Sequence, residues 1–187
     1  MIKFTPDHKK IVEALNFLIL SANSRGVSPS QYQLVKSLFL ADRAHLNKFG
    51  RPITFDQYVA MIHGPVPSFA YDCLKSSFDW RTLDMTTAPW SSEAKGRVHH
   101  FSMDDNNQKF KRLSKSDTSA LHDALTTILS LDFGQIRKIT HEDRAYVSAW
   151  KDEEDISAFP MNMALLLDEE DEAAIEDVRY LAEMTSI

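Results

Sequence analysis

The chain has 187 residues, of which 43% are hydrophobic and 26% are charged, as is usual for one globular domain with a buried core. No apolar stretch approaches the roughly 18 residues that span a bilayer, and the first residues lack the apolar core of a signal peptide. We therefore expect a cytoplasmic protein. The single cysteine, Cys73, has no partner for a disulfide within the chain, which agrees with a reducing compartment.

Charge is distributed unevenly along the chain. Residues 152–187 contain twelve Asp or Glu and one Arg, a net charge of −11. The other residues contain 15 acidic and 20 basic side chains, a net charge of +5. The sequence therefore indicates a mildly basic body with a strongly acidic end. Neither part has the clustered Lys and Arg of a nucleic-acid-binding surface, so we do not expect a nucleic-acid partner.

Two amphipathic helices are predicted at the start of the chain. The first begins at Pro6, with Thr5 as its N-cap, and ends near Gly26. The second follows Ser28 as N-cap and ends at Gly50. In both segments apolar residues recur at the helical spacing expected of a buried face: Ile11, Leu15, Leu18, Ile19, Leu34, Val35, Leu38 and Phe39.

The segment after the second helix combines an extended break, a short strand and a rigid turn. Pro52 keeps the preceding residue out of the helical conformation, and the composition of residues 55–61 predicts a strand. In the sequence HGPVP at 63–67, glycine permits unusual backbone angles and two prolines restrict the chain before a helix that begins near Pro67. The turn either serves folding alone or forms one wall of a partner-binding surface. The free N–H groups of that next helix would also suit an anion.

The second half of the chain is predicted to be largely helical. Residues 79–96 lack periodicity and indicate a loop, whereas 97–103 and 108–113 indicate two strands joined by the polar turn 104–107. Helix starts are indicated by paired capping residues: Ser114 with Asp117, Asp132 with Gln135, and Thr140 with Asp143. A last helix directs Ile175, Val178 and Leu181 inward.

The predicted fold class is mainly α, within the α+β class: a helical core with a small antiparallel sheet. We expect the three strands of that sheet to be 55–61, 97–103 and 108–113.

No catalytic or metal-binding signature is evident. The histidines are dispersed, and His141-Glu142 is not followed by a second histidine at the spacing of a zinc protease. The glycine motifs of serine hydrolases, phosphate loops and dinucleotide sites are missing. We therefore expect no enzyme, no cofactor and no metal. Two alternatives stay open: a hydrolase that uses His63 with a carboxylate such as Asp42, and a transcriptional autoregulator, for which the sequence offers no basic recognition helix.

Taken together, several short motifs resemble a known family. LADRAHL at 40–46, GRPIT at 50–54, YVAM at 58–61 and HGPVPS at 63–68 are followed by THE at 140–142 and AW at 149–150. This ordered series resembles the Panacea, or SocA-like, antitoxin domain, also described for phage-associated GepA-like proteins, over residues 8–160. The chain departs from it at Phe55, where the family commonly has glycine, and in the longer spacer between Glu142 and Ala149.

The resemblance implies the antitoxin of a bacterial toxin–antitoxin system, associated with phages or mobile elements, that neutralises a co-encoded toxin by direct binding. An adaptor that delivers the toxin to a protease is the alternative. The family supplies no catalytic residues. The implied division is a Panacea/SocA-like domain at 1–160 and an acidic C-terminal segment at 161–187, with a terminal helix packed on the same domain.

We expect the partner-binding residues to lie around the break and the turn, since Arg and Tyr anchor interfaces more often than most residues. The candidates are Arg43, His45, Arg51, Tyr58, His63 and Pro65. The acidic segment either covers a basic face of the toxin or is a solvated helix face. The sequence does not identify the toxin or the oligomeric state. It also does not decide between direct blocking of the toxin and its delivery to a protease.

Overall fold

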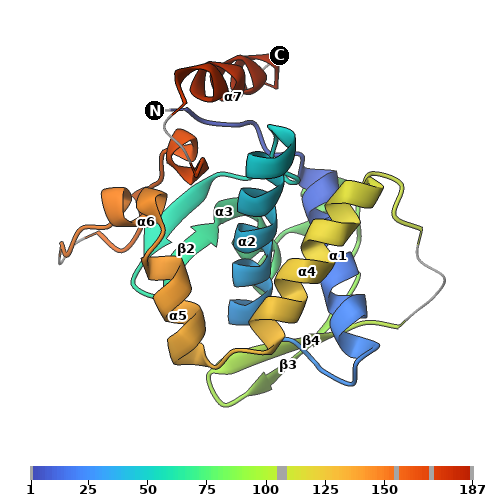
Figure 1. Ribbon diagram of the computed structural model, residues 1–187. Coiled ribbons are helices and arrows are strands. Elements are labelled where there is room, and N and C mark those ends of the chain that lie inside the picture. The colour runs from blue at the N-terminus through green and yellow to red at the C-terminus, as the bar shows by residue number, and fades with distance from the viewer. Residues whose placement is uncertain (1, 105–108, 154–155, 169–170, 186–187) are drawn as a thin grey trace.

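The computed structural model describes residues 2–104, 109–153, 156–168 and 171–185. Within these ranges the chain is mainly helical, with two small antiparallel sheets, which confirms the predicted fold class (Figure 1). The α-helices are α1 (His8–Asn23), α2 (Gln31–Phe49), α3 (Ser68–Cys73), α4 (Lys115–Leu129), α5 (Phe133–His141), α6 (Arg144–Ala149) and α7 (Glu172–Met184). The strands are β1 (Tyr58–Met61), β2 (Gly64–Pro67), β3 (Ser91–Lys95), β4 (Val98–Ser102) and β5 (Phe159–Pro160), and two 3-10 helices are η1 (Trp80–Leu83) and η2 (Met163–Leu166).

Helix α2 occupies the middle of the molecule. Figure 1 shows α4 and α1 on one side of it, and β2, α5 and α6 on the other. Its apolar residues are buried on both sides. Leu34 and Leu38 belong to the core formed with α1 and α4, whereas Phe39 and Leu46 belong to a second core with β1 and the C-terminal elements. Among the described helices, none has the length and apolar character needed to cross a membrane.

Helix α1 begins later than predicted. Its N-cap is Asp7, whose carboxylate accepts a hydrogen bond from the backbone N–H of Lys10 at 3.0 Å, so Thr5 and Pro6 lie outside the helix. The reason is a long-range contact, because the backbone N–H of Asp7 donates to the carbonyl oxygen of Thr54 and holds the entering chain extended.

Helix α2 is likewise capped by Ser30 and not by Ser28. Ser30 and Gln33 form a complete capping box, with the backbone N–H of Ser30 donating to the Gln33 side chain at 2.9 Å. The carbonyl oxygens of Ser28 and Pro29 accept hydrogen bonds from β4, which keeps those residues extended. The predicted end at Gly50 is confirmed, since that residue has the left-handed conformation at φ +72°.

The remaining capping predictions are confirmed with one exception. The boxes at Ser114 and Asp132 are present, and α3 follows Pro67 directly. Thr140, however, lies inside α5, where its hydroxyl donates to the carbonyl oxygen of Ile136, and Asp143 alone caps α6.

The predicted sheet is wrong in its pairing. β1 pairs with β2 across the turn and with β5, whereas β4 forms a separate hairpin with β3, in a region predicted to be a loop. All five residues of β3 are exposed, so its sequence carries no apolar alternation. Residues 109–113 form no strand, because the backbone N–H of Arg112 donates to Glu13 on α1 and Phe110 packs against Phe17. The predicted turn at 104–107 lies, apart from its first residue, outside the described residues, as does residue 108.

Candidate partner-binding site

Asp42 on α2 holds the break in place. Its side chain is buried, and Oδ1 accepts hydrogen bonds from the backbone N–H groups of Ile53 at 2.7 Å and Thr54 at 3.0 Å. Oδ2 accepts from the hydroxyl of Tyr58 at 2.8 Å and from the Thr54 hydroxyl. Burial raises the pKa of Asp42, and these hydrogen bonds oppose that effect. Both carboxylate oxygens are therefore engaged inside the protein.

Asp56 holds the turn and the start of α3 in place through backbone hydrogen bonds. Its carboxylate accepts from the backbone N–H groups of Gln57 at 2.8 Å, Phe69 at 3.1 Å and Ala70 at 2.9 Å. Burial raises the pKa of Asp56 to about 7. Since the Asp56 carboxylate already accepts hydrogen bonds from the first turn of α3, those N–H groups are not free for the anion that the sequence suggested there.

Phe55 has an unusual backbone conformation at the break. Its φ is +56°, a conformation that glycine adopts without strain and other residues rarely adopt. The ring packs edge-on against Phe4, with ring centroids 5.5 Å apart. The left-handed backbone at this position therefore carries a partly buried aromatic side chain that packs against the second core.

A third aspartate, Asp117 on α4, joins three helices. Its fully buried carboxylate lies 2.9 Å from Lys10 Nζ, 3.0 Å from the Arg51 guanidinium and 3.2 Å from His45 Nε2. Burial favours the protonated acid, but the hydrogen bonds from Lys10 and from the backbone of Ser114 lower the pKa of Asp117 overall. Nδ1 of His45 donates to the carbonyl oxygen of Arg51 at 2.8 Å, and burial lowers the pKa of this histidine.

Arg43 connects α2 to the C-terminal segment. Its Nε donates to Asp143 at 2.8 Å and a terminal nitrogen donates to Asp168 at 2.5 Å. The side chain of Asn47, one turn further along α2, donates to the carbonyl oxygen of Leu166 at 2.8 Å. The acidic segment is therefore held against the helix that carries the family motif.

The six predicted contact residues do not form one exposed surface among the described residues. His45, Tyr58 and Pro65 are buried, and Arg43 and Arg51 are partly buried in internal ion pairs. His63 is exposed on the turn between β1 and β2. Partner binding by these six residues stays a prediction. The alternative hydrolase pair is not assembled, since the Asp42 carboxylate bonds internally and the His63 ring packs 5.6 Å from Phe133.

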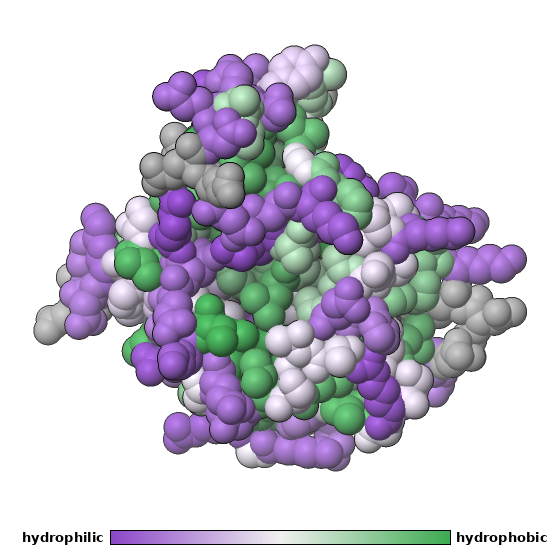
Figure 2. Space-filling model, viewed as in Figure 1, coloured by the Kyte–Doolittle hydropathy of each residue, from purple (hydrophilic) through white to green (hydrophobic). Residues whose placement is uncertain are grey.

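Beside α2, the structure reveals a groove that the sequence did not indicate. A hollow of about 450 Å³ runs between α2 and α4. Its lining includes Leu40, Arg43, His45, Phe49, Ala120 and Ala124. Phe49 is 49% exposed at the end of α2, with its ring 4.5 Å from that of His45. Figure 2 shows green and white atoms over this face, with purple side chains around them. Phe49 follows Leu46 by three residues and so continues the apolar spacing of α2, at the last residue of the helix, where the side chain is no longer covered.

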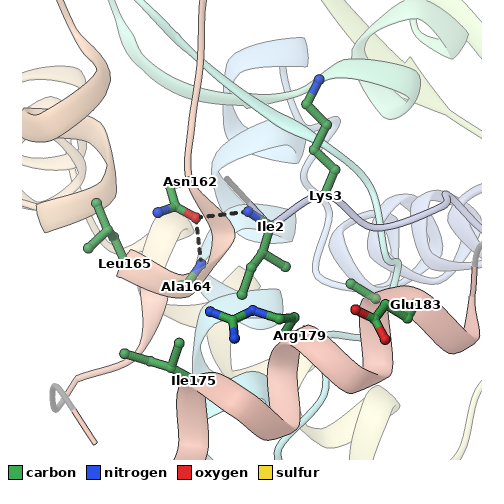
Figure 3. A pocket seen from close by; sticks show the side chains of 9 residues that line it. Ile2, Lys3, Asn162, Ala164, Leu165, Ile175, Arg179 and Glu183 are labelled. Carbon is green, nitrogen blue, oxygen red and sulfur yellow. Dashed lines mark hydrogen bonds between the residues drawn. The ribbon is translucent and has the colours of Figure 1, made fainter. Parts of the chain in front are cut away.

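A second, larger hollow of about 540 Å³ lies where the two ends of the chain meet (Figure 3). Ile2 and Lys3 line one side, and Ile175 and Arg179 of α7 line another. Asn162 organises it, since its side-chain oxygen accepts from the backbone N–H groups of Ile2 and Ala164, both at 3.3 Å. Among the described residues, no group of three or more His, Cys, Asp or Glu side chains is placed to hold a metal ion.

The fold and these anchors define a mainly helical domain whose central carboxylates fix a break, a turn and a helix start. Comparison with protein families identifies that domain. Residues 34–147 match the family described as "Antitoxin SocA-like, Panacea domain". The match covers more than half of the chain, and the chain belongs to this family, which confirms the resemblance seen in the motifs. No curated protein and no solved structure matches the chain.

Proposed function

We propose that this protein is the antitoxin of a toxin–antitoxin system and neutralises a co-encoded protein toxin by binding it directly. The observation that carries the proposal is the family match over residues 34–147, since antitoxins of this kind have a protein partner. The use of Asp42, Asp56 and Asp117 as internal anchors agrees with a binding role, because these carboxylates hold structure and face no open cleft.

The surface that best suits a partner is the groove between α2 and α4. Large exposed apolar side chains beside a hollow are typical of interface anchors, and Phe49 is such a side chain. Arg43 lies on the same lining and supplies charge at its edge. An apolar side chain of the toxin would enter the hollow, and Phe49 would cover it.

The six residues proposed from the sequence then divide into two roles. Arg43 and His63 are exposed enough to touch the toxin. Tyr58, His45 and Arg51 support the surface, because each bonds to a buried aspartate or to the break that leads away from α2. Pro65 supports the turn that carries His63.

The acidic segment supplies a second surface. Residues 152–187 carry a net charge of −11, which would attract a basic toxin face and raise the association rate. Because Arg43 lines the groove and holds Asp168, part of this segment lies beside the groove, and both surfaces would contact one partner.

The test is co-expression with the product of the neighbouring gene. The wild-type chain should restore growth, and Phe49→Glu should abolish the rescue while the protein stays folded. Val98→Glu is the matched control, since Val98 is 45% exposed on β4, away from the groove, and should rescue fully. Growth arrest in the presence of soluble wild-type chain would refute the proposal. A toxin level that falls on co-expression would favour delivery to a protease over direct blocking.

A further inference from the structure

Helix α2, the turn between β1 and β2, and helix α5 meet around Gly64. Its φ is +97°, and a Cβ atom at this position would lie 2.9 Å from Thr140 Oγ1, 3.0 Å from Lys36 Nζ and 3.3 Å from His141 Cδ2. Only glycine therefore lets the turn approach these side chains. The sequence analysis singled out this turn, and the proposed toxin groove does not use it.

Lys36 is buried, and among the described residues no acidic side chain pairs with it. The residue is 0% exposed, and its ammonium donates to the carbonyl oxygen of Pro65 at 2.7 Å and lies 5.2 Å from the centre of the Tyr32 ring. A carbonyl and an aromatic face do not neutralise a buried positive charge, so the desolvation cost stays largely uncompensated. Burial accordingly lowers the pKa of Lys36 to about 7.

Two side chains beside Lys36 and Gly64 each carry a buried polar atom that lacks a partner among the described residues. The hydroxyl of Tyr32 and Nε2 of His141 are buried, and neither has a hydrogen-bond partner among the described residues. Native structures satisfy most buried polar groups, so an orphaned pair calls for an explanation. Tyr32 is one helical turn before Lys36 on α2, and His141 crowds Gly64 from α5.

Among the described residues, the charged groups that act most strongly on these atoms are basic. The groups that act electrostatically on His141 are Arg137, Lys36 and His63, and Arg137 also acts on Tyr32. A hollow of about 170 Å³ is lined by Tyr32, Lys36 and His63. This volume suits a small group and falls below the roughly 300 Å³ at which pockets for whole drug-sized ligands begin.

We propose that Lys36, Tyr32, His63 and His141 form an oxyanion site around Gly64, which takes a phosphate or carboxylate group. The ammonium of Lys36 has two donors to spare, and the Tyr32 hydroxyl and a protonated His141 Nε2 would donate to the same anion. Ile62 is 60% exposed beside the hollow and Phe133 is 53% exposed against His63, so the anion would be carried by a group with apolar surface.

The isolated chain tests the site. Thermal unfolding is followed in chloride, acetate and inorganic phosphate at equal ionic strength, for wild type and Lys36→Met. The Lys36→Met variant should still fold, because methionine fills a similar space and removes the buried charge. The control is Lys9→Met, an exposed lysine on α1. At ten times the dissociation constant, phosphate or acetate should raise the Tm of wild type and of the control by roughly 3–6 °C, and leave that of Lys36→Met unchanged.

A second variant keeps the test independent of Lys36→Met. His141→Phe retains the ring contact with Tyr146, whose centroid lies 4.3 Å away, and removes the unpaired nitrogen. It should weaken the response to the anion at least fivefold. Equal Tm shifts in wild type and both variants, which would mean a general salt effect, or no shift with either oxyanion, would overturn the proposal.

Binding measurements on the toxin complex identify which molecule carries the anion. Only this part of the test rests on the proposed function. If an acidic side chain of the toxin occupies the site, saturating phosphate and Lys36→Met should each weaken the complex at least tenfold. If a free phosphate or carboxylate compound is the ligand, both should leave toxin binding unchanged. Failure of the antitoxin proposal would remove this arm and leave the result on the isolated chain intact.

Discussion

Lys36 should make the stability of this protein depend on pH in an identifiable way. Its pKa changes from 10.5 in the unfolded chain to about 7 in the folded protein. Between these values the unfolded chain binds one more proton, so the free energy of unfolding rises with pH from about 7 to 10.5. Below pH 7 both states are protonated, and above 10.5 neither is, so the contribution is constant outside this window.

The size of the effect follows from the shift. A difference of about 3.5 pKa units corresponds to about 5 kcal/mol in total. Roughly 2 kcal/mol of this should appear between pH 7 and pH 9, where most proteins can be measured. Because other groups also titrate, the useful quantity is the difference in unfolding free energy between wild type and Lys36→Met.

Urea unfolding at pH 7, 8 and 9 in phosphate-free buffer measures that difference. Lys36→Met should be more stable than wild type at pH 7, and its advantage should shrink by about 2 kcal/mol at pH 9. Lys9→Met should follow wild type at every pH. A pH-independent difference between wild type and Lys36→Met would refute the account of a buried lysine that pairs with no acidic side chain among the described residues, and with it the physical basis of the oxyanion site.

Three further predictions concern the anchors of the fold. Tyr58→Phe removes a hydrogen bond to the buried Asp42 and should lower the unfolding free energy by about 1–2 kcal/mol in urea titration; no loss would show that this hydroxyl is dispensable. Burial raises the pKa of the Cys73 thiol to about 12, so a disulfide reagent at pH 8 should label folded protein about a hundredfold more slowly than unfolded protein, and equal rates would contradict its burial. Arg43→Met removes both ion pairs of that residue and should speed hydrogen exchange in the C-terminal segment, whereas Arg81→Met, which removes an exposed pair, should not. Unchanged exchange in the first variant would mean that the segment is held by its apolar contacts alone.

Local signals in the sequence predicted most of the helices. Serine or aspartate three residues before a polar partner located the starts of α4 and α5, because a capping box satisfies backbone groups within one turn. The same rule placed the start of α2 at Ser28, because tertiary bonds from β4 decide between two candidate serines and leave no trace in the local pattern.

Strand pairing was harder to predict, for a physical reason. β3 is exposed along its whole length, so it lacks the apolar alternation that marks a strand, and it is held by the turn at Gly96 and by pairing with β4. The partner of β1 at β5 lies about a hundred residues away along the chain. Short pairings at such separation depend on the packed core and not on local propensity.

The candidate site was predicted only in part. The motif residues around Asp42 were recognised, but a carboxylate that anchors a break and one that faces a ligand look alike in sequence. Lys36 was missed because a lysine on an amphipathic helix is usually solvated, and its burial here depends on the long-range approach of the turn at Gly64 and Pro65. Phe49 was missed because its spacing from Leu46 is that of a core residue, and only the packed structure shows that this end of the helix is left exposed.

The central claim is that this chain acts by binding a protein toxin, and titration calorimetry with the purified product of the neighbouring gene tests it most directly. We expect a saturable complex with a dissociation constant below about 1 μM, the range of specific interfaces, and at least tenfold weaker binding by Phe49→Glu. If both proteins are folded and no heat of binding or co-elution is found, the antitoxin account is contradicted.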